Sequence, residues 1–286
     1  MKVLVTGVKG QLGHDVMKEL AARGIPAVGA DIDQFDLTSR AETEAFVLGE
    51  KPDVIVHCAA FTAVDKAESE KELCRRVNVD GTAYIAGCAK TLDAKLVYIS
   101  TDYVFDGQGE TPFETDSPAR PINFYGETKW LGEQAVRERV EKAFIIRVSW
   151  VFGINGGNFV KTMLRLAKTG NEQNVVGDQI GSPTYTPDLS RLIVDMIATE
   201  RYGTYHASNE GFCSWYEFAC KIFEYAGIPM KVNALTSEEY NNRFHPAAKR
   251  PFNSRLSKKS LDEAGFARLP AWEDALKRYL KQLKDQ

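Results

Sequence analysis

Near its start the chain reads KVLVTGVKGQLG at residues 2–13, a short apolar run that leads directly into three spaced glycines. The run is typical of a buried strand, and Leu12, Val16 and Leu20, at four-residue steps, predict a helix that begins after the glycines. Glycines between a strand and a helix let backbone N–H groups and the helix N-terminus approach a pyrophosphate. The order predicts a dinucleotide-binding turn, although its GxxGxxG spacing differs from the usual GxGxxG. The alternative is a glycine-rich turn that binds no ligand.

The alternation of strand and helix patterns continues through the first half of the chain. Five short runs in which nearly every residue is apolar indicate parallel strands buried on both faces, with amphipathic helices between them. We expect these strands at residues 2–6, 27–31, 54–58, 95–100 and 144–148. The pattern predicts an α/β protein with a Rossmann-type, doubly wound parallel sheet and right-handed crossovers.

Beyond about residue 150 the pattern becomes less regular. Helices are expected near residues 159–168 and 187–199, and a strand is expected near Val175. We therefore expect an NAD(P)-binding Rossmann domain at residues 1–150 and a smaller C-terminal α/β lobe at residues 151–286. This lobe would mainly bind the substrate, and some of its elements would return to the first domain.

The composition, 44% hydrophobic and 26% charged over 286 residues, is that of an ordinary globular protein. Because 36 Lys and Arg face 39 Asp and Glu, no basic field is present and we expect no nucleic-acid partner. Five cysteines without a CxxC pair suit a reducing compartment. No run of eighteen apolar residues occurs and the first apolar run is too short for a signal peptide, so we expect a cytoplasmic protein without a membrane partner.

The second expected strand ends in Asp31, about twenty residues beyond the glycines, where a carboxylate can accept hydrogen bonds from ribose hydroxyls. An acidic group there repels a 2′-phosphate, whereas the flexible cation of Lys9 could contact one. The sequence therefore favours NADH and leaves NADPH open. Asp33 and Asp36 lie close enough to take the place of Asp31, and a solvated acidic residue at a strand end is the alternative.

Tyr125 and Lys129 lie one helical turn apart in the run YGETK. An ammonium near a phenol lowers the pKa of the phenol, so Tyr125 could act as an acid in one direction and a base in the other. Alone, such a YxxxK run is commonly structural. At the end of the fourth expected strand, however, the run STDYVF at residues 100–105 offers a hydroxyl that could polarise a carbonyl group alongside Tyr125.

Together these motifs resemble the extended short-chain dehydrogenase/reductase superfamily over the whole chain. The chain is similar in particular to the dTDP-4-dehydrorhamnose reductase family, whose members make dTDP-L-rhamnose by reducing a 4-keto sugar nucleotide. The stretches that carry the resemblance are AAFTAVDKAE (59–68), STDYVF (100–105), NFYGETK (123–129), RVSWV (147–151), NFVKTML (158–164) and RPFNSRL (250–256).

The resemblance implies a nicotinamide dinucleotide as cofactor. The glycine turn would hold its diphosphate, Asp31 its ribose, and the next loop its adenine, while the segment after the third strand and the catalytic helix would face the nicotinamide. The implied cofactor-binding residues are Gly7, Gly10, Gln11, Leu12, Gly13, Asp31, Asp36, Leu37, Ala60, Phe61, Thr62, Tyr125 and Lys129. Phe61 stands where related sequences often have His or Tyr.

The resemblance also implies that Thr101, Tyr125 and Lys129 form the catalytic trio, with Thr101 in contact with the substrate. Asp102 and Trp150 would lie beside the sugar, and Arg250 would contact the nucleotide; a turn residue, a core aromatic residue and a solvated arginine are the respective alternatives. The substrate implied is dTDP-4-dehydro-6-deoxy-L-mannose, and its product would serve cell-surface polysaccharide synthesis.

Other readings of the same trio remain open. A sugar-nucleotide 4,6-dehydratase typically shows Thr-Asp-Glu at the strand end, where this chain has Tyr103, and a 4-epimerase or a non-catalytic nucleotide-binding subunit would share the fold. A homodimer is possible. Asp15 matches a position that in some relatives binds magnesium at a dimer interface, but its partner carboxylates are not matched and the four histidines lack metal-ligand spacing. We therefore predict no metal.

Overall fold

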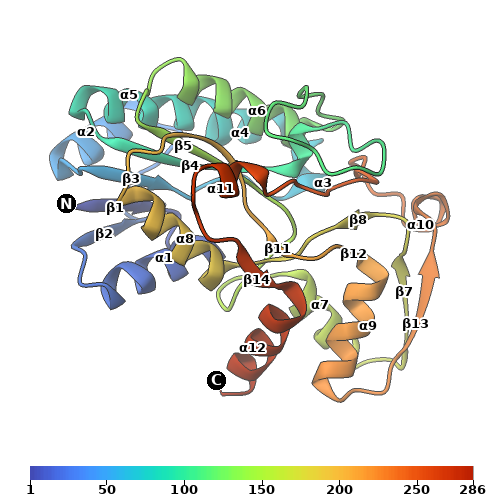
Figure 1. Cartoon of the computed structure of the whole chain (residues 1–286). Coiled ribbons are helices and arrows are strands. Elements are labelled where there is room, and N and C mark those ends of the chain that lie inside the picture. Colours follow the sequence, from blue (N-terminus) through green and yellow to red (C-terminus); the bar gives the residue numbers. More distant parts are fainter. Residues whose placement is uncertain (286) are drawn as a thin grey trace.

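The computed structural model describes residues 1–285 and is built around a six-stranded sheet with the strand order β10-β5-β4-β3-β1-β2 (Figure 1). Every neighbouring pair in this sheet is parallel. Its strands are β1 (Val3–Thr6), β2 (Ala27–Ala30), β3 (Val54–His57), β4 (Lys95–Thr101), β5 (Ala143–Val148) and β10 (Gly203–His206). The predicted α/β class with a doubly wound parallel sheet is confirmed.

Helices cover both faces of the sheet because successive strand residues point to opposite sides. Val3 and Val5 of β1 pack on one side against α1 and α8, whereas Leu4 packs on the other side against α2, α5 and α6. In Figure 1 the first group lies below the sheet and the second above it. These helices are α1 (Gln11–Ala22), α2 (Arg40–Glu50), α5 (Thr82–Leu92), α6 (Phe124–Arg137) and α8 (Thr186–Ile197).

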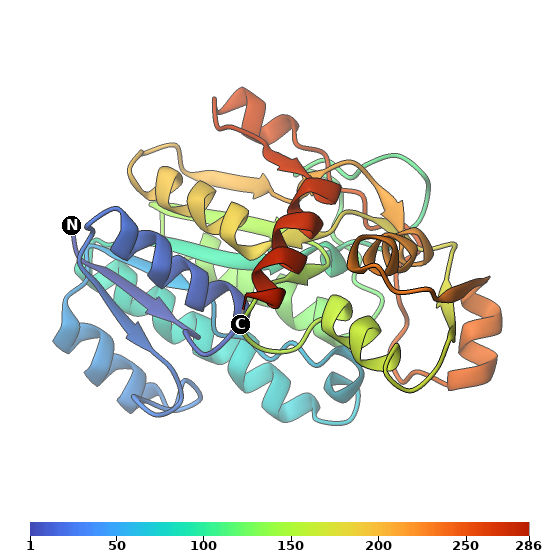
Figure 2. The same cartoon turned by 90° about the horizontal axis from the view of Figure 1, so that it is seen from below.

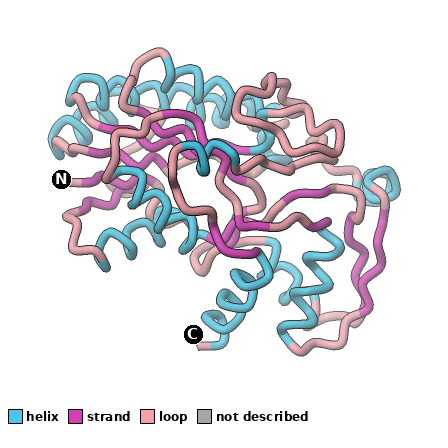
Figure 3. The backbone as a smooth tube through the Cα atoms, in the orientation of Figure 1, coloured by secondary structure: helices cyan, strands magenta, loops and turns pink. Residues whose placement is uncertain are grey.

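A second lobe has its own core, built largely of aromatic and aliphatic residues between helices and a parallel strand pair. Figures 2 and 3 show this lobe beside one end of the sheet. Its main elements are α7 (Phe159–Leu166), β7 (Glu172–Val176), α9 (Trp215–Ala226), β13 (Lys231–Leu235), α10 (Ser237–Phe244) and α12 (Trp272–Lys284). Throughout residues 1–285, each helix is too short or too polar to traverse a lipid bilayer.

Shorter elements connect these layers. Three two-stranded pairs join β6 (Val151–Phe152) to β9 (Thr184–Tyr185), β8 (Ile180–Gly181) to β12 (Cys213–Ser214), and β11 (Asn209–Glu210) to β14 (Leu269–Ala271). The short helical segments are α3 (Val64–Ala67), α4 (Lys71–Arg75), the π-helical η1 (Arg76–Gly81), the 3-10 turn η2 (Asp102–Val104) and α11 (Lys259–Glu263).

The five strands expected from apolar runs occur within one residue of their expected ends. The sixth strand, β10, comes from the second half of the chain and pairs with β5. Its residues, GTYH, form no continuous apolar run, which is why the sequence pattern misses it. Helix α8 also comes from the second half and covers the sheet. The domain boundary at residue 150 stays a prediction.

Candidate active site

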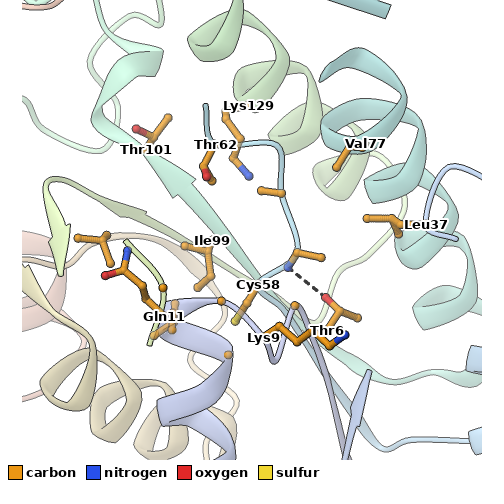
Figure 4. A pocket seen from close by; sticks show the side chains of 18 of the residues that line it. Thr6, Lys9, Gln11, Leu37, Cys58, Thr62, Val77, Ile99, Thr101 and Lys129 are labelled. Atoms are coloured by element: carbon orange, nitrogen blue, oxygen red, sulfur yellow. Dashed lines mark hydrogen bonds between the residues drawn. The ribbon is translucent and has the colours of Figure 1, made fainter. Parts of the chain in front are cut away.

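A cleft of about 1090 Å³ opens at the carboxyl ends of the sheet strands and reaches Trp215 of the second lobe. This is where parallel α/β sheets bind their ligands. Most of the predicted site residues line it, namely Gly7, Gly10, Gln11, Leu12, Gly13, Asp31, Asp36, Leu37, Ala60, Thr62, Thr101, Asp102, Tyr125, Lys129 and Trp150. Figure 4 shows Leu37 and Val77 toward one end of this cleft and Thr62, Thr101 and Lys129 farther along it. Phe61 and Arg250 are not part of the lining.

The turn between β1 and α1 depends on two of its glycines. Gly7 adopts φ +71°, and a Cβ there would lie 2.7 Å from the Ala59 nitrogen; a Cβ on Gly13 would lie 2.4 Å from the Gly7 oxygen. Helix α1 begins after Gly10 with no side-chain cap and no acidic residue in its first turn. Its first N–H groups therefore remain available for an anion such as a diphosphate.

The glycine turn is tied to the second half of the chain by side-chain amides. The carboxamide oxygen of Gln11 accepts hydrogen bonds from the Gly153 nitrogen at 2.8 Å and from the Asn158 amide at 3.0 Å. The Asn155 amide donates to the Lys9 carbonyl oxygen at 2.6 Å. The segment at residues 153–158 is thereby fixed against one wall of the cleft.

Acidic groups occupy the end of the cleft beyond β2. Asp31 accepts a hydrogen bond from the backbone nitrogen of Lys9 at 2.9 Å, while the Lys9 ammonium pairs with Asp33. Hydrogen bonds from Thr38 hold the pKa of the Asp36 carboxyl below its usual range. The guanidinium of Arg76 donates to the Thr38 hydroxyl at 2.7 Å and lines the same end of the cleft. Sequence reasoning missed Arg76 because it lies in a π-helical segment far along the chain.

Apolar side chains line the cleft beside these acidic groups. Ile32 and Leu73 are 64% and 44% exposed, which is unusual for large aliphatic residues, and both belong to the lining. Phe35, Leu37 and Val77 complete this region. Partly open apolar walls such as these can hold a flat aromatic base.

Helix α6 carries Tyr125 and Lys129 into the cleft. The Asn123 side chain caps this helix by accepting a hydrogen bond from the Gly126 nitrogen at 2.8 Å. A Cβ on Gly126 would lie 2.1 Å from the Tyr103 carbonyl oxygen, so only glycine lets the helix start pack this closely on η2. This packing places Tyr125 in the lining of the same cleft as Thr101, which lies at the end of β4.

The electrostatics of Tyr125 and Lys129 differ from expectation, because burial shifts the pKa of both side chains. Burial raises the pKa of the Tyr125 phenol above its usual value, and the Asp102 carboxyl adds to this effect. Burial also lowers the pKa of Lys129 to about 7, and its ammonium lies 4.1 Å from the centroid of the Tyr98 ring. The expected lowering of the Tyr125 pKa is therefore wrong, because desolvation dominates at this phenol. A neutral phenol is the form that can donate a proton.

A buried ion pair anchors α6 one turn after Lys129. The Glu133 carboxylate accepts hydrogen bonds from the Arg147 guanidinium at 2.8 Å through both oxygens and from the Ser100 hydroxyl at 2.6 Å. Glu133 and Arg147 are 0% and 2% exposed. The pair joins α6 to β4 and β5 and thus fixes this helix on the sheet. Sequence reasoning did not identify it.

Two tryptophans from different parts of the chain line the cleft together. Trp150 has a positive φ of 49°, which is costly for a bulky residue. Its ring stacks on Trp215, with 3.7 Å between centroids and 16° between planes. A Cβ on Gly181 would lie 2.7 Å from the Trp150 ring. The strained backbone therefore places the indole in a tight slot that faces the cleft, and Trp215 was missed by the sequence analysis.

Phe61 and Arg250 are held by other contacts. The backbone nitrogen of Phe61 donates to the Asn78 side chain at 2.8 Å. Arg250 forms an ion pair with Asp65 at 2.7 Å. Their predicted roles stay predictions.

Asp15 is buried, and its carboxylate accepts a hydrogen bond from the Thr186 hydroxyl. Burial raises the pKa of this carboxyl. Among residues 1–285, no cluster of three or more His, Cys, Asp or Glu side chains is arranged to hold a metal ion. The expectation that no metal is bound stays a prediction.

The chain was compared with known proteins. A family model described as the RmlD substrate binding domain matches residues 1–285. The spore coat polysaccharide biosynthesis protein SpsK of Bacillus subtilis is 41% identical over 281 residues, which cover 98% of this chain and 97% of SpsK.

Two solved structures have nearly the same fold. A dTDP-4-dehydrorhamnose reductase from Clostridium acetobutylicum is 40% identical, with a TM-score of 0.95 over 99% of this chain and 100% of that chain. The dTDP-4-dehydrorhamnose reductase of Bacillus anthracis, solved in complex with NADP, is 43% identical, with a TM-score of 0.94 over 98% of this chain and 99% of that chain.

Proposed function

Since the chain belongs to the dTDP-4-dehydrorhamnose reductase family, we propose that it reduces the 4-keto group of dTDP-4-dehydro-6-deoxy-L-mannose to form dTDP-L-rhamnose, using NADH or NADPH. It is an oxidoreductase with a nicotinamide cofactor. The observation that carries the proposal is the shared cleft, because Thr101, Tyr125 and Lys129 line the same cavity as the glycine turn.

The residues present fit a nicotinamide dinucleotide. The bare glycine turn and the uncapped N-terminus of α1 would hold the diphosphate through Gly10, Gln11 and Leu12, and Asp31 would accept hydrogen bonds from the ribose. Ala60 and Thr62, which follow β3, would lie beside the nicotinamide. When bound, the reduced nicotinamide supplies the hydride that the ketone carbon accepts.

Tyr125 supplies the proton in this proposal. Its pKa is raised, so the phenol stays neutral and can donate to the substrate oxygen as negative charge develops there. Thr101 gives that oxygen a second hydrogen bond, and the Lys129 ammonium stabilises the tyrosinate that remains and binds the nicotinamide ribose. Loss of one such donor costs about 3 kcal/mol of transition-state stabilisation.

We propose a preference for NADH. Asp31 presents a carboxylate where NADPH carries its 2′-phosphate, and Lys9, the cation that could offset this charge, is paired with Asp33. Arg76 is the group that would let NADPH bind, because its exposed guanidinium lies at the same end of the cleft. The Bacillus anthracis relative binds NADP, so we expect both cofactors to be used to some extent.

At the other end of the cleft, we propose that Asp102 and Trp150 contact the sugar and that Arg250 contacts the nucleotide diphosphate after its ion pair with Asp65 opens. The relative SpsK is named for spore coat polysaccharide biosynthesis, which supports a role in supplying a deoxysugar for cell-surface polysaccharide. A cytoplasmic location and a homodimer remain predictions of this proposal.

The test is incubation with dTDP-4-dehydro-6-deoxy-L-mannose and each reduced cofactor, followed by NMR of the product and by absorbance at about 340 nm. Stoichiometric loss of reduced cofactor with formation of dTDP-L-rhamnose supports the proposal. An epimerised product without net cofactor oxidation, or a 4-keto product from dTDP-glucose, would replace it by epimerase or dehydratase activity. Binding without turnover would indicate a non-catalytic subunit.

A further inference from the structure

The single proton of the Thr101 hydroxyl is already committed in this structure. The hydroxyl donates to Oδ1 of Asp102 at 2.9 Å, and it accepts a hydrogen bond from the Tyr103 nitrogen at 3.2 Å. A threonine hydroxyl has one proton and two lone pairs. One lone pair therefore remains, and no proton remains for a substrate.

This commitment conflicts with donation to the substrate oxygen. An ionised carboxylate can only accept hydrogen bonds, so an ionised Asp102 forces Thr101 to donate to it. A protonated Asp102 can instead donate to the remaining lone pair of Thr101. The threonine proton is then free to point into the cleft, which Tyr125 also lines.

We propose that Asp102 is protonated during the reduction and, by donating a hydrogen bond to Thr101, turns the Thr101 hydroxyl toward the substrate oxygen. Asp102 is in this respect a positioning residue that acts through Thr101, in addition to its predicted contact with the sugar. The inference rests on the proposed reduction and specifies the hydrogen-bond direction that it requires.

The surroundings of Asp102 favour the protonated form. The residue is 3% exposed, and within residues 1–285 its Oδ2 atom is buried with no hydrogen-bond partner. The Ser254 hydroxyl approaches the carboxyl without reaching hydrogen-bond geometry to Oδ2. Burying an ionised carboxylate that has an unsatisfied oxygen costs much free energy, whereas burying a neutral carboxyl group costs less desolvation free energy. Burial accordingly raises the pKa of Asp102 to about 6.

The charged and titratable neighbours do not reverse this preference. The phenols of Tyr103 on η2 and Tyr125 on α6 face the carboxyl, and both have raised pKa values. Arg250 and Asp65 lie beyond Tyr103 and pair with each other. Hydrogen bonds from hydroxyl and backbone N–H groups lower the pKa of Asp102, and they are the main effects that act against the rise caused by burial. A bound cofactor and sugar would exclude more water and raise the pKa further.

The proposal predicts a specific pH dependence. The carboxyl donates below its pKa and accepts above it, so the kcat of the unaltered protein should fall as pH rises from about 6. The fall should approach tenfold per pH unit until one oxyanion donor is lost, which corresponds to about 10²–10³-fold. This fall forms a descending limb in the plot of kcat against pH. Because kcat reports the enzyme–substrate complex, the limb should begin at the pKa that Asp102 has when cofactor and sugar nucleotide are bound.

The decisive variant is Asp102→Asn, whose amide can donate to Thr101 at every pH. We expect this variant to lose the limb that belongs to residue 102. Asp102→Ala cannot donate, and its kcat should lie at least about tenfold below that of Asp102→Asn at pH 8. An Asp102→Asn profile that retains the limb of the unaltered protein overturns the proposal. A change confined to the KM for the sugar also overturns it, since that result would mark a contact with the substrate only.

Lys129, with a pKa of about 7, could produce a limb of its own, so Thr101 provides the control. Thr101→Ser keeps the hydroxyl and should keep the limb. In a Thr101→Val background, Asp102→Asn should leave the pH profile unchanged, because the hydroxyl through which Asp102 acts is absent. If Asp102→Asn alters the profile equally with and without the Thr101 hydroxyl, the assignment is wrong.

A second readout does not depend on turnover. Infrared difference spectra of the protein with oxidised cofactor and dTDP should show the band of a protonated carboxyl group, which Asp102→Asn removes and Thr101→Ser keeps. Absence of that band below pH 6 overturns the inference even if the protein is active. If instead the unaltered protein shows the band but does not reduce the sugar nucleotide, the proposed function fails and the protonation state of Asp102 stands.

Discussion

The ring of Trp150 lies face to face with the ring of Trp215 at a centroid distance of 3.7 Å. Trp150 lies two residues beyond the end of β5, whereas Trp215 begins α9 in the second lobe. The stack therefore connects the sheet to the lobe at the end of the cleft where the sugar is proposed to bind. Such a connection can hold the strained φ of Trp150, because each ring restricts the other.

We expect Trp215→Ala to weaken sugar-nucleotide binding by loosening Trp150. A stacked aromatic pair is worth about 0.5–1.5 kcal/mol, so the KM for the dTDP-sugar should rise by up to about tenfold. The Kd of the reduced cofactor, measured by fluorescence titration, should not change, because its predicted site is at the other end of the cleft. Trp215→Phe is the matched control that keeps a ring. Equal KM values for the alanine variant and the unaltered protein would contradict this role.

Tyr125→Phe removes the proposed proton donor and little else. We expect it to bind cofactor with unchanged Kd and to lose turnover by about a hundredfold or more, since one proton donor typically contributes 10²–10⁴-fold. Single-turnover measurement of cofactor oxidation tests this at the chemical step. The control is Tyr84→Phe, which removes a phenol from α5 outside the cleft lining. Comparable turnover in the Tyr125 variant would defeat its assignment.

Cofactor choice should respond in opposite directions to two substitutions. Asp31→Asn removes the charge that repels a 2′-phosphate, so the ratio of kcat/KM for NADPH to that for NADH should rise by about tenfold. Arg76→Ala should lower the same ratio because the guanidinium that can pair with the phosphate is lost. Steady-state kinetics with both cofactors measure the ratio. If both substitutions move it in the same direction, the placement of the adenosine ribose is wrong.

Removing one partner of the buried ion pair between Glu133 and Arg147 should destabilise the protein, because the other charge is then left unpaired. Glu133→Leu leaves a buried guanidinium unpaired and should lower the free energy of unfolding by about 3–5 kcal/mol. Adding Arg147→Met should recover much of that loss. Urea unfolding followed by circular dichroism measures both. Glu138→Gln, at an exposed site of the same helix end, should change stability by less than about 0.5 kcal/mol.

The burial of Asp102 should also appear in the pH dependence of folding. Its pKa is raised from 3.8 to about 6 in the folded chain, so the folded state binds the proton more tightly than the unfolded state does. The contribution of Asp102 to the free energy of unfolding is fully present below about pH 4 and is lost as pH rises through 6. At pH 8, Asp102→Asn should therefore be more stable than the unaltered protein by about 2–3 kcal/mol. Urea unfolding at pH 8 and pH 5 should show this advantage shrinking at the lower pH.

The sheet was predictable because strands buried on both faces are nearly continuous apolar runs, a signal that survives without any knowledge of contacts. The glycine turn and the YxxxK helix were equally visible, since each depends on neighbours within a few residues. Strand β10 was not predictable in this way. Its four residues include exposed Gly203 and partly exposed Thr204, because it lies at the edge of the sheet.

What the sequence could not supply was depth of burial and contacts between distant segments. One helical turn of spacing places Lys129 near Tyr125 but does not reveal that the ammonium lies over the Tyr98 ring. It also gives no sign that desolvation dominates both pKa values. The stack of Trp150 on Trp215 and the pairing of Arg250 with Asp65 likewise join residues far apart in the chain, for which no local pattern exists.

The position of β10 at the sheet edge, next to β5, has a consequence for biosynthesis. As the polypeptide leaves the ribosome, the first five strands can pair before β10 has been translated, but the open side of β5 and the apolar face covered later by α8 stay uncovered until then. The nascent chain must therefore pass through a stage in which the sheet is incomplete and exposes an unpaired strand edge and an apolar face. Chaperone capture or slow translation around residues 150–206 would act on that stage.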